Sequence, residues 1–129
     1  MTYAMRMPAL ALILFLGGTS GLAIAQGRVV VEIDKVQVVH AISGIVRDPS
    51  GTPVSGATVS EISPDRKTVI QSTTTDQRGS FVIVPTAKKK VYDLRISFDK
   101  SPGFNPLIVH VRVSKWTKKL LDLKLYIST

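Results

Sequence analysis

The chain has 129 residues, with 17 Lys and Arg residues against 9 Asp and Glu residues, so its net charge is +8, and it has no cysteine. A chain of this length has room for one domain with one hydrophobic core. The lack of cysteine excludes disulfides, zinc ribbons, haem attachment through thioethers and cysteine nucleophiles. The two histidines, His40 and His110, are too few for a histidine-rich metal site, although they could join carboxylates.

The first 25 residues have the composition of a secretory signal peptide. Arg6 precedes an apolar run at residues 9–16, and small residues follow up to Ala23-Ile24-Ala25. A basic start, a short apolar middle and an A-x-A end are typical of a segment that is removed on export, here by cleavage before Gln26. We therefore expect a signal peptide helix at residues 1–25.

A retained membrane anchor is the alternative for this segment. Residues 8–25 are close to the shortest apolar stretch that spans a bilayer, and Gly, Thr and Ser interrupt them. Exported domains without disulfides are more typical of the bacterial cell envelope than of small animal secreted proteins. The sequence therefore predicts a periplasmic or secreted protein with no stable membrane span after cleavage.

From Arg28 onward, apolar residues alternate with polar ones at a period of two, and Gly, Pro, Asp and Ser interrupt the pattern at short intervals. This pattern predicts seven or eight short β-strands and almost no helix. A leading segment at residues 28–34 is either a strand or a tether. The predicted strands that follow it are residues 36–47, 57–62, 67–74, 80–84, 91–98, 107–113 and 120–127.

The alternation also predicts which side chains share a face. In the first long strand the shared face holds Val36, Val38, His40, Ile42 and Val46. In residues 107–113, the odd-numbered Leu107, Val109, Val111 and Val113 face one way, and Ile108, His110 and Arg112 face the other. In the last strand, Leu121, Leu123, Leu125 and Ile127 alternate with Asp122, Lys124 and Tyr126. Each strand can bury one face and leave the other in water, so two antiparallel sheets closed over the apolar faces are the simplest fold.

Three motifs lie in and around the turns between these strands. The first runs from Ser43-Gly44-Ile45-Val46-Arg47-Asp48 through Gly51 and Pro53 to Val54-Ser55-Gly56-Ala57-Thr58-Val59. The second is Thr75-Asp76-Gln77-Arg78-Gly79-Ser80-Phe81, and the third is Tyr92-Asp93-Leu94 with the later Gly103-Phe104. Their residue types favour a Gly-rich hairpin, an Asp-capped turn with a Gly at positive φ, and a Phe that returns to the core.

Together, residues 42–104 resemble the carboxypeptidase regulatory-like domain family. The resemblance implies an all-β, seven-stranded antiparallel Greek-key β-sandwich of transthyretin-like type, in modules that are generally non-catalytic. With the signal-like start, this gives a division into a signal peptide (1–25), an N-terminal extension or leading strand (26–38) and the sandwich domain (39–129). Hydrolases with a similar sandwich need His and Arg at a dimer cleft and a C-terminal Tyr-Arg-Gly-Ser, whereas this chain ends Tyr126-Ile127-Ser128-Thr129. That activity is therefore the weakest alternative.

The two histidines lie in opposite environments by this pattern, which argues against a shared catalytic or metal site. His40 falls on an apolar-rich face and is expected at the core edge with one hydrogen bond, while His110 falls on a polar face and is expected in water. Catalysis or metal binding needs several ligands or a positioned nucleophile, and the sequence offers neither. We expect no catalytic residues, no cofactor and no metal.

Two basic loops are the candidate ligand-binding residues: Lys88, Lys89 and Lys90 in one, and Lys115, Trp116, Lys118 and Lys119 in the other. If they lie at one end of the sandwich, the cations and the indole suit an anionic polysaccharide or a protein of the cell envelope. Export argues against nucleic acid. The competing interpretation is that lysines protect strand ends from aggregation. A further alternative is a structural module that pairs with a partner protein through a sheet edge; the oligomeric state is open.

Overall fold

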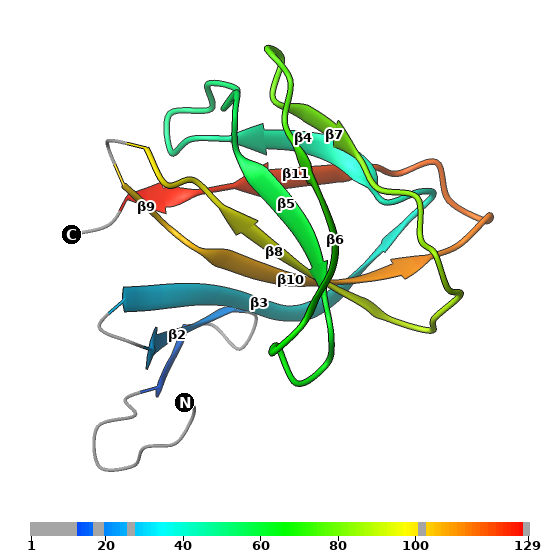
Figure 1. Ribbon diagram of the computed structural model, residues 1–129, viewed down its shortest axis with the longest axis horizontal. Coiled ribbons are helices and arrows are strands. Elements are labelled where there is room, and N and C mark those ends of the chain that lie inside the picture. The colour runs from blue at the N-terminus through cyan, green and yellow to red at the C-terminus, as the bar shows by residue number, and fades with distance from the viewer. Residues whose placement is uncertain (1–12, 17–19, 26–27, 101–102, 128–129) are drawn as a thin grey trace.

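The computed structural model describes residues 13–16, 20–25, 28–100 and 103–127, and these contain twelve β-strands and no helix. The all-β class is confirmed. In chain order the strands are β1 (Ile13–Leu16), β2 (Ser20–Ala25), β3 (Arg28–Val39), β4 (Ser43–Arg47), β5 (Thr58–Ile62), β6 (Val69–Thr74), β7 (Ser80–Val82), β8 (Tyr92–Ser97), β9 (Phe104–Asn105), β10 (Leu107–Val113), β11 (Leu121–Lys124) and β12 (Tyr126–Ile127) (Figure 1).

Ten of these strands lie beyond residue 27, rather than the seven predicted. The difference has two sources. The predicted strands 36–47 and 120–127 are each interrupted, so that they divide between β3 and β4 and between β11 and β12. The short β9 was not predicted, because two residues next to Pro106 are too few to show a period.

The strands form two main sheets that face each other, as Figure 1 shows. One has the order β1-β2-β3-β10-β8-β5-β6, the other has the order β11-β4-β7, and β12 pairs separately with β9. Most pairs are antiparallel, but β10 pairs with β3, and β11 with β4, in parallel. The sandwich is therefore mixed rather than wholly antiparallel, which the long connections between these strands allow.

The core fills the space between the two sheets. β8 and β10 contribute Leu94, Ile96, Leu107, Val109 and Val111, and the smaller sheet contributes Val46, Phe81, Leu121 and Leu123 from the other side. Each of these side chains is buried, and burial of one such side chain contributes about 1.5–3 kcal/mol. The predicted inward faces of these strands are confirmed at these positions.

Three face predictions are wrong at the edges of the core. Val113 is 41% exposed because β8 pairs with β10 only as far as Val111, and Ile127 is 55% exposed because β12 lies outside the main sheets. Ile108 was expected in water but is 4% exposed. Ile108 lies on the outer face of the large sheet, across which the β5–β6 turn extends its Arg66 to Glu32 of β3.

The shared face predicted from Val36 to Val46 is broken by a corner at residues 40–42. Val36 and Val38 are half-buried and His40 is exposed, whereas Ile42 and Val46 are buried. At the corner the chain passes from the large sheet into the small one, so the alternation before and after it refers to different surfaces. His40 is therefore not at the core edge as predicted, although it makes the one expected hydrogen bond.

The first two motifs meet through Thr75, which is 4% exposed. Its hydroxyl donates to the carbonyl of Val54 (2.7 Å) and accepts from the amide of Ala57 (2.9 Å). The predicted Asp-capped turn is confirmed: Oδ1 of Asp76 accepts the amide of Ser80 at 2.9 Å, and Gly79 has a φ of 73°. These residues hold the turns together, so their role is structural.

The leading segment is a strand rather than a tether, because residues 28–33 of β3 pair with β2 and residues 31–33 and 37–39 pair with β10. Residues 13–16 and 20–25 are the strands β1 and β2, so the helix expected at 1–25 is not found there. The rest of that predicted signal peptide, and the expected cleavage point at Gln26, lie outside the described residues. No helix long and apolar enough to cross a membrane occurs in the part of the chain that the structure describes.

Candidate functional site

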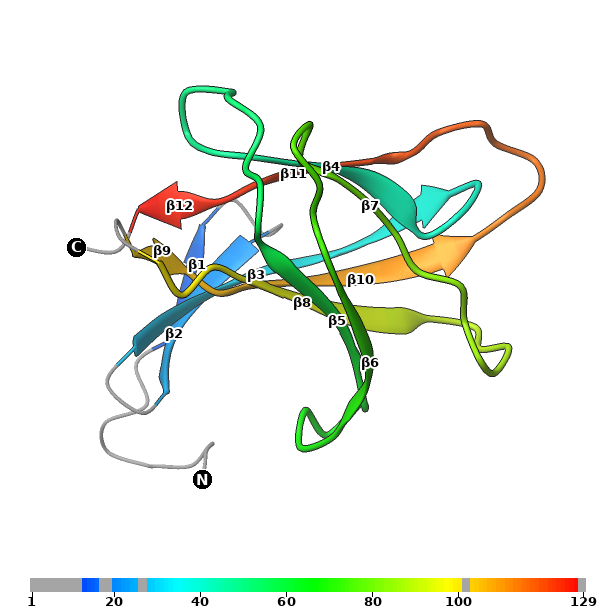
Figure 2. The same ribbon diagram turned by 45° about the horizontal axis from the view of Figure 1, so that its top comes forward.

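Three connections gather at one end of the sandwich: the β3–β4 corner, the β7–β8 loop and the β10–β11 loop. Figures 1 and 2 both show them at the right, where β10 ends and β8 begins. The register explains this arrangement, because Val111 near the end of β10 pairs with Tyr92 at the start of β8, while β3 runs parallel to β10. The two basic loops predicted from the sequence are therefore brought to the same end; we refer to it as the basic end.

The β10–β11 loop is held by hydrogen bonds at both of its ends. The amide of Ser114 donates to the carbonyl of Val39 (2.8 Å), and the carbonyl of Lys119 accepts from the amide of His40 (2.8 Å). The ring Nδ1 of His40 lies 3.0 Å from the carbonyl oxygen of Thr117. The loop is thus fixed to the β3–β4 corner, and Trp116 projects from a defined backbone.

Trp116 is 88% exposed, more than any other large hydrophobic side chain among the described residues. Its neighbour Lys115 lies over the ring, with Nζ 5.3 Å from the ring centroid. An exposed indole has a flat apolar face and a polar N–H, so it can stack on a ring such as a sugar. Lys118 and Lys119, further along the same loop, are also exposed.

The β7–β8 loop is held by the hydroxyl of Tyr92. This hydroxyl accepts the amide of Lys89 at 2.9 Å and donates to the carbonyl of Ala87 at 3.3 Å. Lys88 and Lys90 are exposed, but Lys89 turns inward, and its Nζ lies 3.2 Å from a carboxylate oxygen of Glu61. The middle lysine therefore anchors the loop, and the two beside it reach solvent.

Glu61 was not singled out from the sequence, although it is 1% exposed. It lies opposite Leu94, on the inward face of β5 that it shares with Val59. The amide nitrogen of Gln71 donates to Glu61 Oε1 (3.1 Å) and to the carbonyl of Val84 (2.9 Å), so the carboxylate has partners on both oxygens. The period-two pattern would have found it, since Glu61 follows Val59 by two residues.

Of the seven predicted site residues, only Lys89 forms an ion pair among the described residues. The other six are exposed at the basic end, and none forms an ion pair with a described carboxylate: Lys88, Lys90, Lys115, Trp116, Lys118 and Lys119. They present cations and one aromatic ring, and this arrangement can bind an anion.

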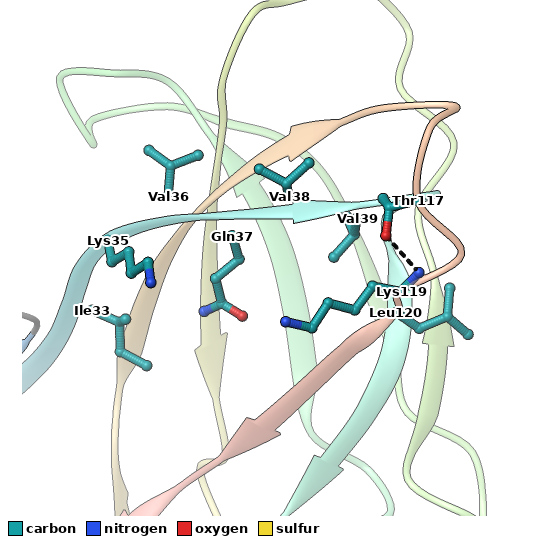
Figure 3. A pocket seen from close by; sticks show the side chains of 9 residues that line it. All are labelled: Ile33, Lys35, Val36, Gln37, Val38, Val39, Thr117, Lys119 and Leu120. Atoms are coloured by element: carbon teal, nitrogen blue, oxygen red, sulfur yellow. Dashed lines mark hydrogen bonds between the residues drawn. The ribbon is translucent and has the colours of Figure 1, made fainter.

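An open groove of about 520 Å³ adjoins the basic end, between β3 and the β10–β11 loop (Figure 3). Figure 3 shows Ile33, Lys35 and Gln37 of β3 on the same side of the strand, with Lys119 and Leu120 opposite them. The lining is amphipathic, with two lysines and an amide among aliphatic side chains. The groove was not predicted, because it depends on where β3 lies relative to residues about eighty positions later in the chain.

His110 lies away from this end, on the outer face of the large sheet. The prediction that its side chain is solvated is wrong. Its side chain is 19% exposed. Nδ1 lies 2.6 Å from Asp93 and Nε2 lies 2.8 Å from Glu32, which also pairs with Arg66 at 2.7 Å. The two histidines have different partners, so they do not form one site. Among the residues that the structure describes, no group of three or more His, Asp and Glu side chains could hold a metal ion.

The charges of this cluster stabilise one another. Burial lowers the pKa of His110, but hydrogen bonds to Asp93 and Glu32 outweigh it, and the pKa lies above its usual value. Burial likewise raises the pKa of Glu32, but hydrogen bonds from Arg66 and His110 bring it below the usual value. This row of charged side chains lies on the outer face of the large sheet and links the neighbouring strands β3, β10 and β8.

The fold and the site define a β-sandwich module without a catalytic constellation in its described part. Residues 41–126 match the family model of the carboxypeptidase regulatory-like domain, and the chain belongs to this family. The resemblance identified from the motifs is thereby confirmed. The domain is a β-sandwich of a regulatory type that is often non-catalytic. No curated protein matches the chain.

Proposed function

We propose that this protein is an exported, non-catalytic binding module, and that the basic end binds an anionic polysaccharide of the cell envelope. The single observation that carries the proposal is that the fold brings an 88% exposed Trp116 and two lysine-containing loops to one end. A buried indole stabilises a fold, whereas an exposed one with a lysine over its ring contributes little to stability and is suited to stacking on a ligand.

The chemistry of the basic end favours a polymer with both rings and negative charges. Trp116 offers a stacking surface for one sugar ring, and Lys88, Lys90, Lys118 and Lys119 offer ammonium groups for carboxylates on neighbouring sugars. Because these lysines are exposed, their attraction for an anionic polymer extends about one Debye length, roughly 8–10 Å at moderate salt, and weakens as salt is added. The signal-like composition of residues 1–25 supports export to where such polymers occur.

The test is a fluorescence titration with oligogalacturonate, a soluble acidic oligosaccharide. The chain has one tryptophan, so its emission reports directly on the basic end. We expect the oligosaccharide to change the emission at low salt, and added NaCl to weaken the affinity. A neutral oligosaccharide of the same length should bind much more weakly.

Two charge-reversed variants separate local recognition from overall charge. Lys88→Glu/Lys118→Glu alters the basic end, and Lys100→Glu/Lys124→Glu alters exposed lysines elsewhere. Each pair lowers the net charge from +8 to 8 − 4 = +4. We expect the first pair to lose at least about tenfold in affinity and the second to lose much less. Equal losses in both pairs would contradict a site at the basic end.

A further inference from the structure

The edge of β3 is only half covered. β2 pairs with residues 28–33 of β3, from Ala25 opposite Arg28 to Ser20 opposite Ile33. Beyond Ile33, no strand in the described part of the chain pairs with this edge, and the next contact is the hydrogen bond from the amide of His40 to Lys119. Residues 34–39 therefore form an open sheet edge beside the groove.

The direction of the backbone groups follows from the flanking hydrogen bonds. The carbonyl of Val39 accepts from Ser114, at the end of β10, whereas the amide of His40 points to the opposite side. Backbone polar groups of successive residues in a strand alternate between its two sides. The N–H and C=O of Val38 therefore point to the open side, where an added strand could bond to them.

The groove adds side-chain recognition to this edge. Lys35 and Lys119 extend into it from its two walls, with Ile33 and Leu120 beside them (Figure 3). Neither lysine forms an ion pair with a described residue. An occupant that carries negative charges and apolar groups would therefore complement the lining.

We propose that residues 34–39 of β3 and the adjoining groove bind an extended acidic peptide segment of a partner protein as an added strand. In the full chain β2 pairs with residues 28–33 of this same edge, so the edge accepts an antiparallel strand. Cleavage before Gln26, which we expect on export, removes β2 and leaves residues 28–33 open to the partner segment as well. Backbone hydrogen bonds supply affinity, and acidic side chains facing Lys35 and Lys119 supply specificity. A polysaccharide has no matching row of N–H and C=O groups, so a peptide is the better occupant.

The probe is a synthetic ten-residue peptide of alternating glutamate and valine, added to the whole protein. We expect amide hydrogen exchange at Val36 and Val38 to slow when the peptide binds. A version of the peptide with alternate backbone nitrogens methylated keeps the side chains but removes donors, and should bind at least about tenfold more weakly. A version with lysine in place of glutamate should also bind more weakly, because it opposes Lys35.

Variants of the protein test the same edge from the other side. Val38→Pro removes an outward N–H, while Val38→Thr keeps it; we expect only the first to lose affinity for the peptide. Because proline could disturb β3 itself, thermal unfolding of both variants is compared, and Lys35→Glu serves as a second variant with an intact backbone. Equal binding of the methylated and unmethylated peptides would overturn the proposal. It would also fail if oligogalacturonate, and not the peptide, protected Val36 and Val38.

Discussion

The ammonium of Lys89 lies 3.2 Å from the carboxylate of Glu61, which is 1% exposed. This pair joins the β7–β8 loop to the inward face of β5. It holds the loop in place, so that the neighbouring Lys88 and Lys90 reach solvent. The buried carboxylate of Glu61 is thus neutralised from within the fold rather than left to repel an anionic ligand.

Removal of Lys89 should destabilise the protein. In Lys89→Ala the carboxylate of Glu61 stays buried and keeps Gln71 as its partner, but it loses the cation. Leaving a buried acceptor without a partner costs about 1–3 kcal/mol, and we expect the free energy of unfolding to fall by this amount in urea titrations. Lys90→Ala, an exposed neighbour, should change it by less than about 0.5 kcal/mol.

The double variant Lys89→Ala/Glu61→Gln distinguishes the ion pair from the loss of side-chain packing. Because Gln at position 61 carries no charge, the double variant should recover part of the stability that Lys89→Ala loses. If Lys89→Ala unfolds at the same urea concentration as the unaltered protein, the pair does not anchor the loop.

The cluster around His110 makes stability depend on pH in a defined direction. The folded-state pKa of His110 is raised above 6.5, so its contribution is complete below 6.5 and is lost as pH rises through the raised value. The pKa of Glu32 is lowered from 4.5, so its contribution is present above 4.5 and is lost as pH falls through the lowered value. The cluster therefore stabilises the fold most between about pH 4.5 and 6.5.

His110→Gln tests this pH dependence. The amide keeps a hydrogen bond to one carboxylate but cannot carry a charge. We expect the variant to be less stable near pH 6 and to lose the decline in unfolding free energy that the unaltered protein shows above pH 6.5. His40→Gln, which changes the exposed imidazole at the β3–β4 corner, should keep that decline. Parallel curves for His110→Gln and the unaltered protein would contradict the role of the cluster.

Two motif glycines should differ sharply when changed to alanine. A Cβ at Gly44 would lie 2.0 Å from the carbonyl oxygen of Leu121, in the parallel strand beside it. A Cβ at Gly51 meets nothing within 4 Å, so only its φ of 92° opposes the change. We expect Gly44→Ala to cost about 3 kcal/mol or more and Gly51→Ala about 1 kcal/mol, measured by urea unfolding.

Comparable stabilities of the two alanine variants would show that β11 can move away from β4. The close approach at Gly44 would then not be what fixes their parallel pairing.

Local patterns in the sequence predicted much of the fold. The alternation in residues 107–113 gives the bounds of β10 without error, and the Asp76 motif gives a turn in which Asp76 Oδ1 accepts from the nearby amides of Arg78 and Ser80. Such features are fixed by neighbours in the chain. The corner at His40 was missed because β-branched residues lie on both sides of it, at Val38 and Val39 and at Ile42.

Long-range features of the site could not be predicted in the same way. The partner of His110 in β3, Glu32, is 78 residues away, and only the parallel pairing of β3 with β10 brings them together. The placement of Trp116 and Lys88 at one end also depends on strand order, which alternation does not specify. Glu61 is the exception, since its place beside Val59 on an inward face was visible in the sequence.

The most direct test of the account is a two-dimensional NMR titration of the protein with oligogalacturonate. The account predicts that amide shifts change at residues 86–91 and 114–119, together with the indole N–H of Trp116, and that the changes shrink as NaCl is added. Shift changes confined to the β5–β6 turn at residues 63–68, with the indole signal unmoved, would contradict it.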